Sequence, residues 1–518
     1  MSFQTFKCAR AFFIRCLLLH SVAGYAEQIY QCNHHLQTAS IQIAAKTMDA
    51  RYKKFAQEQH LPGYIFGIML DGRLIHTGHY GYADVKNKIP VNANTYFRIA
   101  SMTKSFTAMA IMQLRDGGKL KLDDPIAHYL PATKNLKLTQ DSPDITIRDL
   151  LTHSAGFPED NSWGDRQLDL TQDALLNLLK RGVSLSTPAA SDFEYSNLGF
   201  ALLGLVVDKV SGVSLQKFVA KNIWQPLKMH DAAWEYQEIP QGLLAHGYRW
   251  GHGTWEEEPL LHDGSFAAMG GMWISLPAFS RYVALHQAAW PPRDEDDSSP
   301  LKRASLREMH QAWRPYVLSN HPVTPCALNY SYGYGLRRTE NCKKQVIIGH
   351  SGGLPGFGSN WLFLPEYGLA VILFTNQTYA PAEKINREVL DELIEQAHLK
   401  PCTLLVSSIL QQRQHELMHI LPQWNISQSH NIFASNFFKD NPRIGWRKRS
   451  LELFEKLGGI RKVTQLVPQT QLSGSFIIEG VNGSRLKITL ALSPDKPALI
   501  QSLQMEEIAP MKKEIDWA

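Results

Sequence analysis

The 518-residue chain is too long for one average domain, so we expect two or three. Hydrophobic residues make up 44% of it, with 12 Trp and 22 Phe, which suits large cores and excludes a disordered protein. The formal net charge is +5, and three of the positive charges, Lys7, Arg10 and Arg15, lie in the first 26 residues. The rest of the chain therefore has a net charge of +2. The charge therefore gives no indication of a nucleic-acid partner.

Residues 1–26 predict a cleaved signal peptide. A positively charged start is followed by an apolar stretch, Ala11–Ala23, and by small residues that end at Ala26. This pattern predicts export, with the periplasm as the expected compartment. Because Arg15 interrupts the apolar stretch, an uncleaved amphipathic start is the alternative. No later run is long and apolar enough to span a bilayer, so we expect no membrane span once the leader is removed.

The first predicted elements of the mature chain are two strands. Tyr64–Leu70 and Arg73–Gly78 are rich in apolar residues, and Asp71-Gly72 between them favours a tight turn, so we expect a β-hairpin. A segment with an apolar stripe at helical spacing, Ser105–Leu114, follows. The hairpin therefore precedes a helix.

Ser101-Met102-Thr103-Lys104 stands at the start of that helix. A serine three residues before a lysine lies on the same helical face, so the amine can activate the hydroxyl as a nucleophile. Spacing alone does not identify the nucleophile, because Ser214 and Lys217 share it. Ser214 follows Ser211-Gly212 and is typical of a helix N-cap.

Tyr195-Ser196-Asn197 is the only Tyr-x-Asn in the chain, and it directly precedes Leu198–Val210, which predicts a buried helix. A phenol near the serine and lysine could move protons, and the Asn197 amide could orient the lysine or bind a substrate amide. The alternative is a structural tyrosine beside a helix-capping asparagine. His153, within Leu150–Gly156, is a further candidate that could simply cap or pack.

The second half of this region predicts a loop and then strands. Pro291–Pro300 is charged and rich in turn residues, which indicates a solvated insertion. Three strands are predicted beyond it, at Val346–Gly349, Asn360–Leu364 and Leu369–Thr375. Together with the hairpin they predict one sheet built from both ends of the region, with helices inserted between.

His350-Ser351-Gly352-Gly353 follows the first of these strands. Small residues at a strand edge let a substrate backbone lie against the sheet, and a main-chain NH there can join that of Ser101 in an oxyanion hole. The alternative is an ordinary glycine turn.

A second domain is expected to begin near Leu399-Lys400-Pro401, and its first motif, His415-Glu416-Leu417-Met418-His419, has the spacing of a helical zinc site. The motif has no clear third ligand, because Pro422 and Asn425 stand where a longer zinc-peptidase motif needs glycine and histidine. We therefore predict no metal and no cofactor.

The rest of the tail predicts a small α+β unit. A helix is expected at Leu451–Leu457, capped by Ser450 and ended by Gly458-Gly459. Strands are expected at Ser473–Ile478 and Leu486–Leu492, with Asn482-Gly483 as the turn between them.

Cleavage near Ala26 would remove Cys8 and Cys16 and leave four cysteines, Cys32, Cys326, Cys342 and Cys402. Four cysteines allow three pairings. Cys326 and Cys342 flank one short segment, so we favour a disulfide between them. Their spacing fits no zinc pattern.

Taken together, the serine-centred motifs resemble the class C β-lactamase and low-molecular-weight penicillin-binding protein family of serine hydrolases. The order of serine-lysine, tyrosine-asparagine and a polar triplet ending in glycine matches from Ser101 through Gly352, and the resemblance extends from the Tyr64 strand to about Leu399. It implies an α/β (α+β) fold of the β-lactamase/transpeptidase type, an antiparallel sheet flanked by helices, over residues 27–398. Residues 399–518 look like an accessory C-terminal domain of some family members.

The resemblance also implies roles for the motif residues. Ser101 would be the acylated nucleophile, Lys104 its base, and Tyr195 the group that protonates the leaving atom and activates water. Asn197 would position the substrate and Lys104. The main-chain NH groups of Ser101 and Gly353 would form the oxyanion hole, and His350, Ser351 and Gly352 would bind substrate.

One departure from the family matters. Its β-lactamases usually carry Lys-Thr-Gly where this chain has His350-Ser351-Gly352, and a histidine is mostly neutral above about pH 6.5. That weakens the attraction for a substrate carboxylate and is similar to the D-aminopeptidase branch. We therefore expect a hydrolase acting on a small-molecule or peptide substrate, namely an amide, a D-amino-acid-containing peptide or an ester. The alternatives are a β-lactamase and a non-catalytic penicillin- or peptidoglycan-binding protein.

Overall fold

The computed structural model describes residues 29–319, 327–342, 344–424, 431–440 and 442–509. The described chain divides into two compact units, Tyr30–Leu405 and the residues from Val406 onwards. The predicted leader, residues 1–26, lies outside the described residues.

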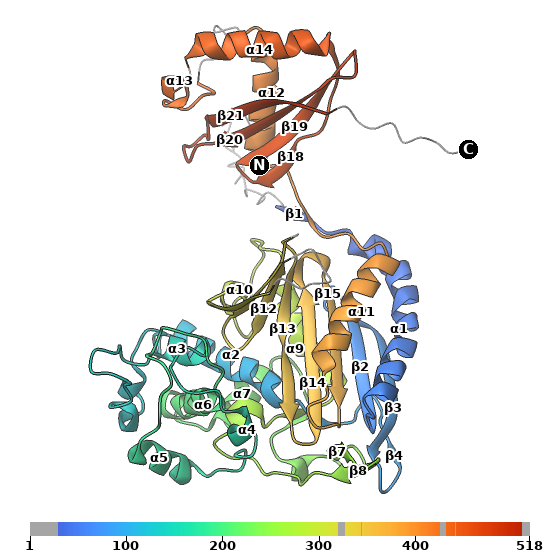
Figure 1. Ribbon diagram of the computed structural model, residues 1–518, viewed down its shortest axis with the longest axis vertical. Helices are drawn as coiled ribbons and strands as arrows, with labels where there is room; N and C mark the ends of the chain where they lie inside the picture. Colours follow the sequence, from blue (N-terminus) through green and yellow to red (C-terminus); the bar gives the residue numbers. More distant parts are fainter. Residues whose placement is uncertain (1–28, 320–326, 343, 425–430, 441, 510–518) are drawn as a thin grey trace, which may run out of the picture. The chain divides into compact units, whose positions relative to one another are not determined.

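The first unit contains a nine-stranded sheet in the order β10-β11-β12-β13-β14-β15-β2-β3-β4 (Figure 1). Its neighbouring strands pair antiparallel, and β2 from the start of the unit pairs with β15 from its end, with Tyr64 opposite Thr375 and Leu70 opposite Leu369. The prediction of one sheet built from both ends is therefore confirmed. The strands are Arg314–Ser319, Leu328–Tyr332, Arg337–Asn341, Val346–Leu354, Phe357–Leu364, Leu369–Thr375, Gly63–Leu70, Arg73–Asp84 and Ile89–Pro90, in the order given above.

The predicted hairpin is β2 and β3, which are longer than expected at their outer ends. Its turn residues Asp71 and Gly72 have φ of 47° and 76°, the left-handed conformations that Asp and Gly tolerate. Every residue of β2 and of β15 is buried, because helices cover both faces of the sheet at this point.

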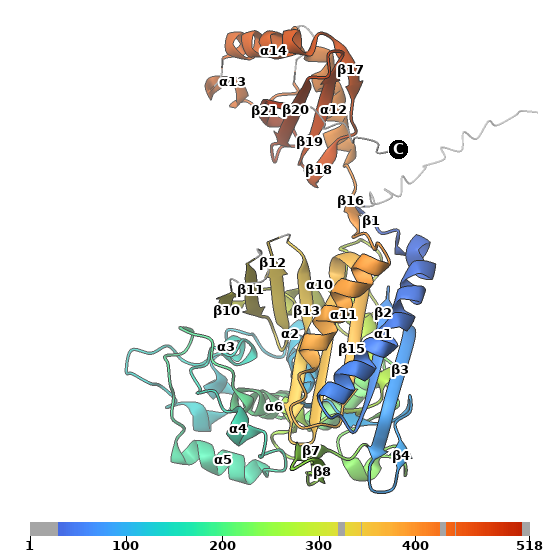
Figure 2. The ribbon, with the colours of Figure 1, turned by 45° about the vertical axis from the view of Figure 1, so that its right-hand side comes forward.

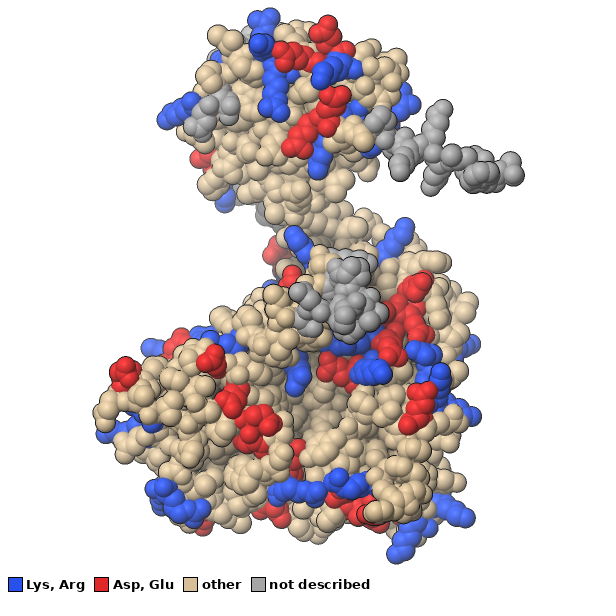
Figure 3. Space-filling model, in the orientation of Figure 1, with Lys and Arg blue, Asp and Glu red and all other residues tan. Residues whose placement is uncertain are grey.

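Two helices, α1 (Thr38–Glu58) and α11 (Ala382–Gln396), lie side by side on one face of the sheet (Figure 2). Their apolar residues form one core with that face, while α9 (Leu276–Ala288) and the helices beyond it form the larger core on the other. Acidic and basic side chains are interspersed on the face shown in Figure 3, and Arg51 of α1 pairs with Glu388 and Glu392 of α11.

The helical insert holds the site. Its central helices are α2 (Thr103–Asp116) and α6 (Asn197–Ser211), which pack against each other and against α8 (Ala267–Gly270). The predicted buried helix is thus α6, which the Ser196 side chain caps by accepting from the Gly199 NH at 3.1 Å. The remaining helices of the insert are α3 (Ile147–Leu151), α4 (Asn161–Gly164), α5 (Gln172–Arg181), α7 (Leu215–Val219) and α10 (Arg303–Met309).

Two further predictions in this unit are confirmed. Pro291–Pro300 contains no helix or strand, and Ser214 caps α7, where its hydroxyl accepts from the Lys217 NH at 3.3 Å.

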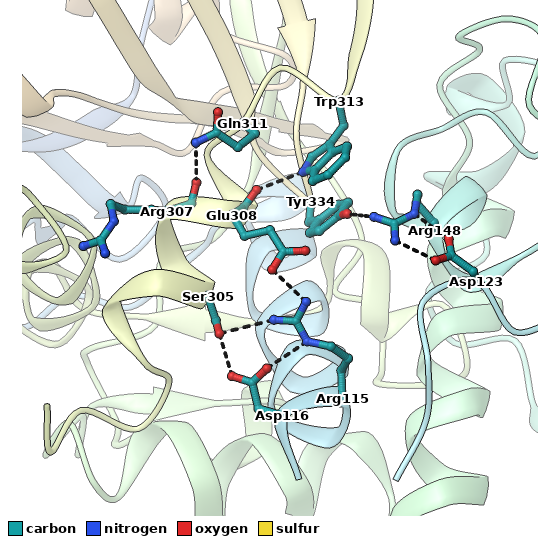
Figure 4. A network of polar contacts seen from close by, with 10 residues as sticks. All are labelled: Arg115, Asp116, Asp123, Arg148, Ser305, Arg307, Glu308, Gln311, Trp313 and Tyr334. Carbon is teal, nitrogen blue, oxygen red and sulfur yellow. Dashed lines mark hydrogen bonds and ion pairs between the residues drawn. The ribbon is translucent and has the colours of Figure 1, made fainter. Parts of the chain in front are cut away.

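The far end of α2 is fixed by polar contacts to α10 (Figure 4). Arg115 donates to Glu308 at 2.7 Å, and the Ser305 hydroxyl donates to Asp116 at 2.6 Å. Arg148, at the end of the same network, donates to the Tyr334 hydroxyl. The contacts to Arg115 and Asp116 hold the far end of the helix that carries Lys104.

A disulfide joins Cys32 to Cys402 across 370 residues of chain. It lies beside the short pairing of β1 (Tyr30–Gln31) with β16 (Thr403–Leu404), so the two ends of the first unit are joined. Cys342 is also disulfide-bonded, and its predicted partner Cys326 lies outside the described residues.

The second unit begins with α12 (Ser408–Ile420) and continues through α13 (Phe437–Asp440) and α14 (Arg443–Leu457) to a five-stranded sheet. The predicted strands and their Asn482-Gly483 turn are confirmed, whereas the predicted helix start is wrong. Ser450 is buried within α14 instead of capping it, since Pro442 is the N-cap residue. The strands are β17 (Ile460–Val463), β18 (Val467–Thr470), β19 (Ser473–Gly480), β20 (Arg485–Leu492) and β21 (Ile500–Ile508).

Over the described part of the chain, no single helix is long and apolar enough to cross a membrane. One pair bent by 73°, Asn197–Ser211 with Leu215–Trp224, passes the same length and composition test when the two are taken together.

Candidate active site

Ser101 lies in the short 3-10 turn η2 (Ala100–Met102), directly before α2, and Lys104 lies in the first turn of α2. The Lys104 amine donates to the Ser101 hydroxyl at 3.1 Å, to Asn197 Oδ1 at 2.6 Å and to the Met269 carbonyl at 3.1 Å. Ala100 has φ of +50°, a left-handed conformation that is uncommon for a residue with a side chain. The spacing seen in the sequence thus places the amine against the hydroxyl.

The environment of Lys104 lowers the pKa of its amine. Its side chain is fully buried, and burial lowers its pKa to about 7, against the opposing effects of Asp165 and Asp160. The Arg337 cation acts in the same direction as burial. An amine with this pKa is neutral in about half of the molecules near neutral pH, so it can accept the proton of Ser101.

The ring of Tyr195 lies over the Lys104 amine, with Nζ 4.8 Å from the ring centroid. Burial raises the pKa of the Tyr195 hydroxyl, although its hydrogen bond with Ser101 and the Arg337 cation oppose the rise. The phenol is therefore protonated at neutral pH and can give a proton to a leaving atom.

Asn197 is held by α4 and by the residues at its two ends, Asp160 and Asp165. The Asp160 carboxylate accepts from the main-chain NH groups of Asn197 at 2.6 Å and Leu198 at 2.9 Å. The Asn197 side-chain NH₂ donates to Asn161 at 3.1 Å and to Asp165 at 3.3 Å. Since both NH₂ donors are used, Oδ1 is left to face Lys104.

The third predicted motif continues strand β13 instead of following it. Gly352 approaches the start of α2 so closely that an added Cβ would lie 2.2 Å from the Ile99 carbonyl oxygen. Gly353 is opposite Gly358 in the register and packs under the Tyr379 ring. Pairing with β14 makes this segment a strand edge beside Ser101, not a turn.

His350 does not face the cavity next to Ser101. It is only 1% exposed, with Nε2 2.9 Å from the Tyr332 hydroxyl and Nδ1 2.5 Å from the Ser351 carbonyl. The carbonyl requires a proton on Nδ1, so Nε2 accepts from Tyr332 and the ring is neutral. Burial, together with Arg337 and Lys104, holds its pKa well below the ordinary value. The position of His350 therefore does not allow the substrate-binding role that we expected for it.

A cavity of about 380 Å³ opens beside Ser101. Its walls include five predicted residues and three segments that the sequence did not indicate, 161–165, Arg337 and 379–380. The lining residues are Ser101, Asn161, Ser162, Asp165, Tyr195, Arg337, Ser351, Gly352, Gly353, Tyr379 and Ala380.

Arg337 is the cation of this cavity. It begins β12 opposite Gly349, and its guanidinium carbon lies 5.9 Å from the Tyr195 ring centroid. Its Nε is buried and has no hydrogen-bond partner among the described residues.

Asp165 is the acid of the cavity. It accepts from the Tyr379 hydroxyl at 3.0 Å, and burial raises its pKa to about 6, against the opposing effect of Lys104. Nothing local in the sequence pointed to either residue, since both lie in segments that only the fold brings together.

Two other sequence candidates lie away from this chemistry. His153 packs against Tyr195, with ring centroids 4.2 Å apart, and its Nδ1 accepts from the Ser196 NH, so it supports the Tyr195 segment from behind. His415 and His419 are neighbours on α12, where Glu416 pairs with Arg413 at 2.5 Å. Over the part of the chain that the structure describes, no three His, Cys, Asp or Glu side chains are grouped as metal ligands.

A serine hydroxyl against a buried lysine of lowered pKa, with a protonated tyrosine beside both, defines the site of a serine hydrolase. Residues 48–394 match the Beta-lactamase family, and the chain belongs to that family. The family resemblance and the β-lactamase/transpeptidase-type fold inferred from the sequence are therefore confirmed.

Three similar proteins illustrate the match. The chain is 27% identical over 346 residues to Protein flp of Staphylococcus aureus (strain COL). This match covers 65% of this chain and 64% of flp, so the chain spans less than two thirds of that relative. It is similar to the octameric penicillin-binding protein homologue from Pyrococcus abyssi, with a TM-score of 0.58 and 21% identity over 87% of this chain and 90% of that one. It is also similar to a class C beta-lactamase, with a TM-score of 0.54 and 18% identity over 70% of this chain and 98% of that one.

Proposed function

We propose that this protein is an exported hydrolase that forms an acyl-enzyme on Ser101 and cleaves an amide, peptide or ester whose leaving group carries a carboxylate. The observation that carries the proposal is the hydrogen bond from the buried Lys104 amine to the Ser101 hydroxyl. The leader pattern at residues 1–26 supports export.

The reaction follows from the protonation states of the site. Ser101 Oγ attacks the carbonyl carbon and passes its proton to the neutral Lys104 amine. The main-chain NH groups of Ser101 and Gly353 hold the developing oxyanion, where one donor is worth about 3 kcal/mol of barrier. As the bond to the leaving atom breaks, Tyr195 gives that atom its proton and is reprotonated by the Lys104 ammonium. Water then attacks the acyl group by the same route in reverse, returning a proton to Ser101 Oγ.

Arg337 supports the preference for a carboxylate. His350 is neutral and buried, so the substitution of histidine for the usual lysine removes a cation from that position. Arg337 supplies a cation beside Tyr195 from the neighbouring strand, and its buried Nε has no partner among the described residues. Because Tyr195 protonates the leaving atom, Arg337 lies on the leaving-group side.

The same cation would attract the carboxylate of a β-lactam, so β-lactam hydrolysis is the second candidate function. The similarity to penicillin-binding and class C beta-lactamase structures supports both candidates. Intact mass after brief incubation with a penicillin separates them. A lasting adduct on the wild type, absent from Ser101→Ala, favours a peptidase that traps the drug, and rapid drug consumption favours a β-lactamase.

A pair of esters tests the role of Arg337. Nitrophenyl acetate and its ring-carboxylated analogue share the acetyl group and differ in the carboxylate on the leaving group. We expect the wild type to prefer the carboxylated ester by about tenfold in kcat/KM, and Arg337→Gln to lose that preference. Arg338→Gln is the matched control, because Arg338 pairs with Glu340 and does not line the cavity. Equal preference in wild type and Arg337→Gln would refute the assignment.

A further inference from the structure

The catalytic cavity carries one acidic side chain whose charge the catalytic steps do not use. Asp165 is 2% exposed, yet it lines the cavity that contains Ser101. Its two oxygens accept one hydrogen bond each from neutral donors, Oδ1 from Asn197 at 3.3 Å and Oδ2 from Tyr379 at 3.0 Å. A carboxylate has room for about four donors, so each oxygen can accept another.

No cation of the described chain is paired with Asp165. Its neighbour Arg166 pairs instead with Glu258 at 3.3 Å. Lys104 is the cation with the strongest influence on Asp165, but its amine is already directed to Ser101, Asn197 and the Met269 carbonyl. A buried carboxylate without a cationic partner is costly, so a cationic ligand would be bound favourably there.

Asp160, at the start of α4, differs from Asp165 in its hydrogen bonds and shows how a carboxylate with a structural role is bonded in this segment. It accepts from the main-chain NH groups of Asn197 and Leu198 and from the Ser196 hydroxyl at 3.1 Å. These bonds cap α6 and occupy both oxygens, and Asp160 does not line the cavity. Among the described residues, Asp165 accepts from no main-chain NH that would give it such a capping role.

Tyr379 connects Asp165 to the strand edge. Its ring packs on Gly353, where an added Cβ would lie 2.8 Å from Cδ1, and its hydroxyl reaches Asp165. An acyl group with its carbonyl between Ser101 and the Gly353 NH therefore has Tyr379 and Asp165 beside it. Arg337 lies by Tyr195, on the side of the leaving group.

We infer that Asp165, oriented by Tyr379, binds an ammonium group carried by the acyl part of the substrate. The inference rests on the proposed acyl-enzyme at Ser101 and narrows its substrate class. The preferred substrate then has a free amine on the residue that acylates the serine and a carboxylate on the part that leaves, as in an unblocked dipeptide.

Two esters with the same leaving group isolate the acyl side. Nitrophenyl glycinate carries an ammonium, nitrophenyl N-acetylglycinate does not, and glycine avoids any choice of chirality. We expect the wild type to favour the glycinate by roughly 10- to 100-fold in kcat/KM, mainly through KM, as for a hydrogen-bonded charge pair. In Asp165→Asn this ratio falls towards one. Asp208→Asn is the matched control and keeps the wild-type ratio, because Asp208 is also a carboxyl whose pKa burial raises to about 6, but it lies outside this cavity.

If Asp165 only balances the charge of Lys104, Asp165→Asn will change the rates of both esters and their pH dependence equally, and the unchanged ratio overturns the inference. A wild type that shows no preference for the glycinate overturns it as well.

Binding to Ser101→Ala separates this inference from the chemistry. Calorimetry with glycylglycine and N-acetylglycylglycine needs no turnover, and we expect tighter binding of the unblocked dipeptide, lost in Ser101→Ala/Asp165→Asn. That result without ester hydrolysis by the wild type would refute the acyl-enzyme and leave the ammonium site standing. Equal binding of the two ligands, or no binding of glycylglycine, overturns the site itself.

Discussion

Replacing Lys104 by methionine measures what it costs to bury the amine that activates Ser101. Methionine keeps the approximate length of the side chain and removes the titrating group. In the folded protein burial lowers the pKa of Lys104 from 10.5 to about 7, so between these values the unfolded chain holds a proton that the folded protein has released.

The difference between 10.5 and about 7 corresponds to about 5 kcal/mol of the free energy of unfolding. Because the folded-state pKa is lowered, the whole penalty is present below pH 7, where both states hold the proton. It then decreases by about 1.4 kcal/mol per pH unit as the pH rises and vanishes above pH 10.5. The hydrogen bonds that methionine cannot make, to Ser101, Asn197 and the Met269 carbonyl, add an offset between the two proteins.

Urea denaturation of wild type and Lys104→Met at intervals between pH 7 and pH 10 gives this difference directly, since all other titrating groups are common to both proteins. We expect the stability of the wild type relative to the variant to rise by about 4 kcal/mol over this range. Ester hydrolysis by the wild type should report the same group, with kcat/KM rising through about pH 7 as Lys104 becomes neutral. A stability difference that does not change with pH would refute a folded-state pKa near 7 and, with it, the neutral base.

Further expectations concern the frame of the site. Replacing Cys32 and Cys402 by serine should lower the free energy of unfolding by about 2–5 kcal/mol, and an unchanged melting temperature would show that the disulfide adds nothing. Gly352→Ala should lower the free energy of unfolding by about 1–3 kcal/mol and remove most of the esterase activity, because the Cβ of the new alanine would displace the Ile99 carbonyl, two residues before the nucleophile. Native-like activity of this variant would contradict the packing. Ser214→Ala should lower the free energy of unfolding by about 1 kcal/mol, because α7 loses its N-cap, and should leave acylation of Ser101 unchanged. Reduced covalent labelling of this variant by a penicillin would count against a purely structural role of Ser214.

The parts of the molecule that could be predicted are those fixed by neighbouring residues. The Asp71-Gly72 turn specifies its hairpin because both residues adopt left-handed conformations. Ser101 and Lys104 meet because one helical turn separates them. Tyr195 and Asn197 could be recognised because they stand at the start of a long apolar helix.

The parts that were missed depend on contacts between distant segments. Arg337 enters the cavity because β12 pairs with β13, and Asp165 does so because the end of α4 packs against Asn197. His350 has the right place in sequence order, but its ring is directed to Tyr332 on another strand. Ser450 is a residue type typical of a cap, yet α14 begins at Arg443 after Pro442 and buries Ser450 in its interior. None of these outcomes can be read from spacing along the chain.

The pairing of β2 with β15 has a consequence for the order in which the molecule can be assembled. During synthesis the hairpin of β2 and β3 leaves the ribosome early, with the ladder groups of β2 unpaired on one edge until residues 369–375 have been made. The Cys32–Cys402 bridge cannot close until later still. An apolar strand that must wait for its partner is open to aggregation in the meantime, so we expect the nascent chain to depend on a holding factor until the first unit is complete.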